Sequence, residues 1–225
     1  CHYCGYSMEL PKICPECGSK YIANFGTGTQ KLEAMTRAEF PNAKVLRMDT
    51  DSVSKKNSAN DMIRDFAKGD ADILIGTQMI VKGHDFDNVT LVGIMAADTS
   101  LYVSNYNSAQ RTFELLTQAA GRAGRAKTGE AVIQTYKPEN YAIAAAAAQD
   151  YKKYFENEMA YRKLGGYPPT CYMLTVMFSS IKEEDLNKCA TTIVNTLKSD
   201  NFFKKSVIIG PTDPSVVKVK DYYRK

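Results

Sequence analysis

The residues with the clearest potential for chemistry are the arginines of QAAGRAGR, residues 118–125. Arg122 and Arg125 are three positions apart, so in a helical turn their side chains would project from the same face. A core gains nothing from two guanidinium groups, but such a pair stabilises the charge that develops on a γ-phosphoryl group during transfer. We therefore predict an arginine-finger pair, with Gln118 beside it as a third catalytic residue. The residues alone leave a solvated basic helix end as the alternative.

A second set of candidate residues forms two C-x-x-C motifs near the start of the chain. Each motif places two thiolates on one tight turn, where both can reach a tetrahedral zinc ion at about 2.3 Å. The predicted metal ligands are Cys1 and Cys4 in the first motif and Cys14 and Cys17 in the second. Because four thiolates would leave no open position for water, the predicted zinc is structural.

A third set follows an apolar run in ILIGTQMIVKGHDF, residues 73–86. Thr77 and Gln78 emerge where the predicted strand ends, and Lys82 follows in the loop. Hydroxyl, amide and ammonium groups suit DNA phosphates, so these three residues are candidate DNA contacts. Gly83 and Asp85 are candidate nucleotide-binding residues, since the carboxylate of Asp85 can accept from a ribose hydroxyl or orient an arginine.

The segment GTGTQKLE, residues 26–33, resembles a phosphate loop only superficially. The Walker pattern requires a serine or threonine after its lysine, and here Leu32 follows Lys31. We interpret the segment as a strand-to-helix turn with the helix beginning near Thr29 or Gln30. Binding of nucleic-acid phosphate by the amides of the helix N-terminus remains an open alternative.

The elements that must position these residues alternate between strands and helices. The apolar runs predict strands at 21–25, 43–48, 71–76, 89–97 and 130–136, and the helical periodicity predicts helices at 31–40, 60–69 and 107–120. Such alternation indicates an α/β fold with a mostly parallel sheet covered on both faces. The candidate residues lie in the loops that follow the strands, where ligands bind in sheets of this kind.

The later part of the chain predicts a connecting helix and a small second domain. An alanine-rich stretch favours one helix over about 142–164, and GGYPP marks a boundary near Gly165. Beyond it we expect strands at 171–180 and 205–211, a helix at 183–200 and a strand at 216–220 without a partner. The expected domains are 1–20 (an incomplete zinc segment), 21–137 (the α/β lobe), 138–165 (the connecting helix) and 166–225 (an α+β DNA-binding domain that is cut short).

Composition limits the class of protein. The chain has 225 residues, a formal net charge of +4 and 44% hydrophobic residues, which is typical of a globular domain. No apolar run approaches the roughly 20 residues of a membrane span, so we expect no membrane partner. The clustered cysteine pairs favour a reducing, cytoplasmic setting, with Cys171 and Cys189 as buried structural thiols. Neither end reads as a natural terminus, so we expect part of a longer protein.

These motifs, in this order, are similar to the second RecA-like lobe of superfamily-two helicases. In detail they resemble the PriA family of primosomal replication-restart DNA helicases. The stretches that carry the resemblance span essentially the whole chain: CHYC, CPECG, GTGTQKLE, FPNAKVLRMDTDS, ILIGTQMIVKGHDFDNVTLVGIMAADTSL, LLTQAAGRAGRAKTGEAVIQTYKPE, YPP and VIIGPTDPSVVKVKDYYRK.

The resemblance implies an ATP-dependent 3′-to-5′ DNA helicase that acts at stalled forks. Its implied partners are single-stranded and branched DNA, primosome proteins and single-stranded-DNA-binding protein. Arg122, Arg125 and Gln118 match the family's arginine-finger motif, and Thr77, Gly83 and Asp85 match its motif coupling nucleotide to DNA. ATP and Mg would be bound mainly by a first lobe carrying the Walker motif, which this sequence lacks. We therefore expect this chain alone to be inactive.

The family also changes the zinc interpretation, because its members carry four interleaved C-x-x-C pairs that hold two zincs. The two pairs of this chain match the third and fourth, so they either share one zinc or form two incomplete sites.

The chain departs from the family before the arginine motif. Neutral Asn105, Asn107 and Gln110 stand where the family usually has charged residues, which questions any salt-bridge network that presents the motif.

Two alternative functions remain. The neutral residues favour a non-catalytic DNA-binding or helicase-loading module, in which the motor motifs are only a scaffold. Another two-lobed DNA translocase, such as a recombination helicase, would share QAAGRAGR but not the cysteine pairs.

Overall fold

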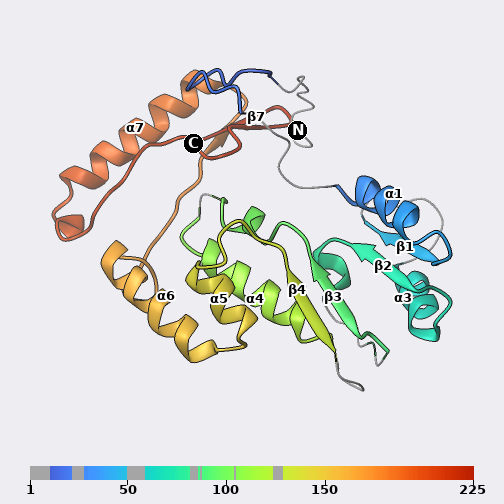
Figure 1. Cartoon of the computed structure of the whole chain (residues 1–225). Coiled ribbons are helices and arrows are strands. Elements are labelled where there is room, and N and C mark those ends of the chain that lie inside the picture. The colour runs from blue at the N-terminus through green and yellow to red at the C-terminus, as the bar shows by residue number, and fades with distance from the viewer. Residues whose placement is uncertain are drawn as a thin grey trace. The chain divides into compact units, whose positions relative to one another are not determined.

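The computed structural model describes residues 11–21, 28–49, 59–81, 86, 88–103, 105–123 and 129–225 (Figure 1). The chain divides into two compact units. One consists of Ala23–Cys171, and the other of Cys1–Ile22 together with Tyr172–Lys225. The strand predicted at 21–25 lies outside the described residues apart from Tyr21, which is irregular.

The first half of the larger unit alternates helices and strands as the sequence predicts. Its elements are α1 (Thr29–Glu39), β1 (Val45–Met48), α3 (Ala59–Lys68) and β2 (Ile73–Gly76). β1 and β2 pair in parallel, with Val45 opposite Ile73 and Met48 opposite Gly76. Both helices contact β1, which buries Val45 and Met48 beneath them.

The second half repeats the pattern. Its elements are the short 3₁₀ helix η1 (Gln78–Ile80), β3 (Leu91–Ile94), the 3₁₀ helix η2 (Ala97–Ser100), α4 (Ser108–Ala120) and β4 (Glu130–Ile133). β3 and β4 pair in parallel, with Leu91 opposite Glu130 and Ile94 opposite Ile133. The parallel pairing predicted from the βα alternation is therefore confirmed, in two strand pairs whose strands have four residues each.

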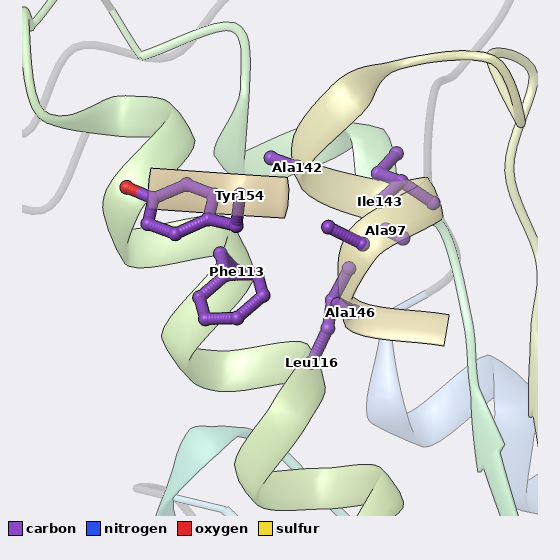
Figure 2. Packing of buried hydrophobic residues seen from close by; sticks show 8 residues of the cluster. Ala97, Phe113, Leu116, Ala142, Ile143, Ala146 and Tyr154 are labelled. Atoms are coloured by element: carbon purple, nitrogen blue, oxygen red, sulfur yellow. The ribbon is translucent and has the colours of Figure 1, made fainter. Parts of the chain in front are cut away.

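The main hydrophobic core lies where α4 meets the helix that follows β4. Phe113 and Leu116 of α4 pack with Ala97 of η2 and with an apolar face at 142–146. Figure 2 shows the ring of Tyr154 lying over Phe113, and the two ring centroids are 4.0 Å apart with planes 8° from parallel. Because alanine side chains are small, the helix that carries the alanine run can approach α4 closely. Three of these alanines are fully buried: Ala142, Ala145 and Ala146.

The expected single helix at 142–164 is instead two helices, α5 (Tyr141–Ala147) and α6 (Tyr151–Gly165). Gln149 breaks the run with a φ of 53°. Asp150 then starts a new helix, because its carboxylate accepts from the amide of Lys153 at 2.9 Å. Asn140 caps α5 in the same way. α5 packs against α4 in the core, so this part of the chain does more than connect domains.

α6 ends at Gly165, where the sequence places its boundary. Gly166 has a φ of 63° and donates its amide to the carbonyl of Arg162. This left-handed position favours glycine because a side chain there would clash with the backbone.

The smaller unit carries one long helix and a small antiparallel sheet. Its elements are β5 (Ser179–Ser180), α7 (Glu183–Ser199), the 3₁₀ helix η3 (Asn201–Phe203), β6 (Lys218–Val219) and β7 (Tyr222–Arg224). The sheet order is β5-β7-β6. The expectation that the strand at 216–220 has no partner is wrong, because β6 pairs with β7 in a hairpin.

Two further expectations for this part of the chain fail. The strand predicted at 171–180 shrinks to β5, and 205–211 forms no strand. Cys171 and Cys189 are not buried thiols, since Cys171 is partly exposed and Cys189 is exposed. α7 buries only Leu186 and Ala190, so the neighbouring Cys189 faces solvent. In the part of the chain that the structure describes, no helix is both long enough and apolar enough to cross a membrane.

Candidate functional site

The loop after β2 presents Thr77 and Gln78 as exposed side chains. Gly76 makes this turn possible, because a Cβ there would lie 2.6 Å from Cγ2 of Ile80 and 2.7 Å from the carbonyl oxygen of Met48. Thr77 precedes η1 in an extended conformation, and its hydroxyl makes no cap bond to that helix. As an exposed group without a cap bond, this hydroxyl is accessible to an external acceptor. Lys82, Gly83 and Asp85 lie outside the described residues.

A carboxylate of the protein, that of Asp49, lies at the N-terminus of α1. The helix begins at Thr29 after Gly28, as the interpretation of GTGTQKLE predicts. The Thr29 hydroxyl donates to Asp49 at 2.5 Å, and Arg47 forms ion pairs with Asp49 and with Glu33. The negative charge of Asp49 beside the first helical turn disfavours a phosphate at this position.

The arginine motif follows α4. Gln118 is exposed on its last turn, and the helix ends where Gly121 donates its amide to the carbonyl of Thr117 at 2.9 Å. Arg122 lies in the turn that follows, partly buried, with its amide donating to the carbonyl of Ala119 at 3.1 Å. Arg125 lies outside the described residues. Because the α-helix ends before both arginines, their relative orientation does not follow from helical spacing.

α4 is held firmly along its buried face, and this fixes the direction in which the motif leaves the helix. Phe113, Leu116 and Ala119 are buried in or beside the core. Thr112 is fully buried, and its hydroxyl lies 2.8 Å from both the hydroxyl of Ser100 and the carbonyl of Ser108. The bond to Ser100 ties the helix to η2 at the carboxyl end of β3, and the bond to Ser108 lies within α4.

Asp98 joins the carboxyl ends of β3 and β4, and the sequence analysis missed it. Its side chain is fully buried and accepts from the Thr135 hydroxyl at 2.8 Å and from the Tyr136 amide at 2.9 Å. Desolvation alone would raise the pKa of Asp98, but the hydrogen bonds favour the carboxylate and leave the pKa below its usual value. An acidic residue directly after an apolar strand, as in MAADTS, is the signal that marks it.

The neutral residues at the start of α4 differ in their partners, and the buried Oδ1 of Asn107 has none among the described residues. Gln110 accepts from Arg162 at 2.7 Å through Oε1 and donates to Glu114 at 2.7 Å through Nε2. Asn105 accepts from the backbone amide of Asn107 at 3.3 Å. An amide at position 110 therefore preserves a connection between α4 and α6 where the family usually has a charge.

The second cysteine motif forms a turn that fits a thiolate ligand. Gly18 has a φ of 69° and donates its amide to the carbonyl of Cys14 at 2.9 Å, while the amide of Cys14 donates to Ser19 at 2.8 Å. The backbone amides of Cys17 and Glu16 face the sulfur of Cys14 and lower the pKa of its thiol. Among the described residues no group of three or more metal-ligating side chains occurs, and Cys1 and Cys4 lie outside them.

Comparison with known proteins gives one consistent family. The helicase conserved C-terminal domain matches residues 17–127. The replication restart protein PriA of Bacillus subtilis (strain 168) is 44% identical over 228 residues, which cover 100% of this chain and 28% of that protein. The corresponding protein of Synechocystis is 37% identical over 226 residues, with 100% and 27% coverage. That of Thermotoga maritima is 34% identical over 224 residues, with 100% and 30% coverage.

The chain thus spans less than a third of the length of these curated relatives. Residues 17–127, with their parallel strands and covering helices, form the RecA-like helicase lobe that the motifs predict. The similarity continues through both cysteine motifs and through the smaller unit to the last residue of the chain. The chain therefore belongs to the PriA family of replication restart proteins.

Proposed function

We propose that this chain is the second motor lobe and adjoining DNA-binding region of an ATP-dependent 3′-to-5′ DNA helicase that restarts replication at stalled forks. The observation that carries the proposal is the position of the arginine motif. α4 is anchored along one face, Gln118 is exposed on its last turn, and Arg122 lies partly buried in the turn that follows. Residues held in this way can act on a nucleotide presented by another lobe.

The proposed catalytic role belongs to Arg122, Arg125 and Gln118. The guanidinium groups stabilise negative charge on the γ-phosphoryl oxygens as the bond to the leaving group breaks, and Gln118 orients the reacting group. Such arginines contribute about 10³ to 10⁵ in rate. ATP and Mg²⁺ are held mainly by a Walker lobe, whose motif this sequence lacks. This chain alone is therefore expected to be inactive.

The proposed DNA contacts are Thr77, Gln78 and Lys82, with Gly83 and Asp85 linking the loop to the nucleotide. Exposure of Thr77 and Gln78 at the end of β2 supports the assignment. Because these groups suit phosphates rather than base edges, binding should be independent of sequence and weaken with salt. Single-stranded and branched DNA are the proposed ligands, and the match to a helicase domain supports DNA binding. The proposed protein partners, primosome proteins and single-stranded-DNA-binding protein, rest on the family resemblance alone.

We also propose a structural zinc held by Cys14 and Cys17, with Cys1 and Cys4 as ligands of the same ion or of a second one. The turn geometry and the amides directed at Cys14 support this. Zinc content of the purified chain tests the assignment. Cys14→Ser should lower it, whereas Cys189→Ser, at an exposed cysteine elsewhere, should leave it unchanged. Equal zinc content in the two variants would refute the site.

ATP hydrolysis tests the helicase proposal. The purified chain should show no turnover with single-stranded DNA, and the full-length protein should show DNA-stimulated turnover. In the full-length protein, Arg122→Ala should abolish most of that turnover, and the exposed Arg64→Ala on α3 should not. Full turnover in Arg122→Ala, with DNA binding retained, would refute the catalytic role of Arg122. Absence of DNA-stimulated turnover in the wild-type full-length protein would favour the non-catalytic loading module instead.

A further inference from the structure

A buried ion pair connects α6 to the elements around it. Arg162 and Glu158 are only 8% and 4% exposed, and Nε of Arg162 donates to Oε1 of Glu158 at 2.7 Å. The other carboxylate oxygen accepts from the hydroxyl of Tyr141 on α5 at 2.6 Å. A charge pair buried to this degree persists only where its remaining donors and acceptors are satisfied.

The two terminal nitrogens of the Arg162 guanidinium donate to two other parts of the fold. Nη1 donates to the carbonyl of Pro168 at 2.7 Å, in the turn after α6. Nη2 donates to Oε1 of Gln110 on the first turn of α4 at 2.7 Å. One planar group thus joins α6, the turn at 166–171 and α4. A lysine has no rigid fork with which to hold three acceptors in these directions.

Aromatic rings close the same junction. The ring of Tyr106, two residues before α4, lies 5.4 Å from the guanidinium carbon of Arg162. It stacks on Tyr167 with ring centroids 5.4 Å apart and planes 12° from parallel. Tyr167 in turn contacts Tyr161 of α6. Gly165 leaves room for this ring, because a Cβ there would lie 2.6 Å from Cε2 of Tyr167.

The junction lies between two parts of the chain with different proposed tasks. α4 leads to Gln118 and Arg122, whereas the turn at 166–171 leads to Tyr172, the first residue of the later segment of the smaller unit. Hydrogen bonds through Pro168, Arg162 and Gln110 connect that turn to the start of α4. The buried core holds the middle of the same helix.

We propose that Arg162 is a positioning residue that couples DNA engagement by the smaller unit to the orientation of α4 and hence of the arginine motif. The proposal rests on the helicase function proposed above. It assigns to the neutral Gln110 the role of the acceptor that links α4 to Arg162, with Tyr106 and Tyr167 as the stacked rings that keep the guanidinium in its plane.

Gln110→Ala in the full-length protein tests the coupling, since it removes the link while keeping the Arg162–Glu158 pair. Its DNA-stimulated ATP hydrolysis should fall about tenfold, a typical effect of losing a hydrogen bond to a charged group. Gln110→Glu, which restores an acceptor, should recover most of the stimulation. The matched control is Asp150→Ala, which removes a cap at the other end of α6 and should lower the melting temperature without reducing stimulation.

A second readout does not depend on catalysis. Forked DNA should change the hydrogen exchange of α4 amides in the wild-type protein and in Asp150→Ala, but not in Gln110→Ala at saturating DNA. An α4 response to DNA in Gln110→Ala equal to that of the wild type would overturn the coupling. Failure of the helicase proposal looks different, because the wild-type full-length protein would then show no DNA-stimulated hydrolysis, while the exchange result still decides the coupling.

Discussion

At the scale of single residues, the sequence identifies exposed candidate site residues more readily than the buried polar residues that support the fold around them. Gln118, Thr77 and Gln78 can be proposed from residue type and position, and the structure finds all three exposed. Asp98 could not be proposed, because its partners Thr135 and Tyr136 lie more than 30 residues away in the sequence. The carboxylate of Asp98 and its two donors come together only in the folded protein, so the sequence does not show that they interact.

Replacing Asp98 by asparagine should destabilise the protein at neutral pH. Both of its partners are donors, and an amide has only one oxygen to accept from them. Leaving one buried donor unsatisfied costs about 1–3 kcal/mol. Urea unfolding at pH 7 measures the change, with Asp70→Asn at an exposed position as the control, which should unfold like the wild type.

The same carboxylate predicts a pH dependence. Its pKa is lowered in the folded protein, so its contribution to stability is present above the ordinary aspartate pKa and is lost as the pH falls through the folded value. The stability difference between wild type and Asp98→Asn should therefore shrink as the pH falls below about 4. A difference that stays constant over this range would show that the carboxylate charge is not what stabilises the strand ends.

Gly76 gives a steric prediction at the end of β2. A Cβ at this position would meet Ile80 and the carbonyl oxygen of Met48 below 3 Å, so Gly76→Ala should cost about 1–3 kcal/mol of folding free energy. Gly93→Ala in β3, where a Cβ meets nothing within 4 Å, is the matched control and should be neutral. Equal unfolding midpoints for the two variants would contradict the close packing at Gly76.

At the scale of elements, hydrophobic periodicity predicts the helices and strands that the structure describes between residues 28 and 133, because apolar residues recur on one side of each element. It fails at 142–164, where the cap formed by Asp150 decides where α6 begins. It also fails at 171–180 and 205–211, where apolar runs form almost no ladder. An apolar run shows that a strand is possible, but a strand forms only where a partner strand lies beside it.

The packing of α5 and α6 on α4 predicts opposite effects for two tyrosines. Tyr141 donates to Glu158, so Tyr141→Phe should cost about 1–2 kcal/mol by leaving a buried carboxylate oxygen without its donor. The buried hydroxyl of Tyr154 has no hydrogen-bond partner among the described residues, so Tyr154→Phe should be neutral or slightly stabilising. Thermal unfolding of the two variants compares them directly, and a larger loss for Tyr154→Phe would contradict the assigned bonding.

At the scale of the whole molecule, the chain carries only part of the residue set that the proposed reaction needs. It belongs to a family of replication restart proteins, carries their helicase C-terminal domain and lacks a Walker motif. The order of motifs was sufficient to predict the family from the sequence. The link from the turn at 166–171 to α4 was not, because Gln110, Arg162 and Pro168 are brought together only by the packing of α6.

The most direct test of the helicase account is DNA-stimulated ATP hydrolysis by the full-length protein before and after Arg125→Ala, with DNA affinity measured in parallel. The account predicts a loss of about a hundredfold or more in the rate with DNA affinity retained, as expected when an arginine acts on the transferred phosphoryl group. An unchanged rate would show that Arg125 does not act on the transferred phosphoryl group and would contradict the catalytic role proposed for QAAGRAGR.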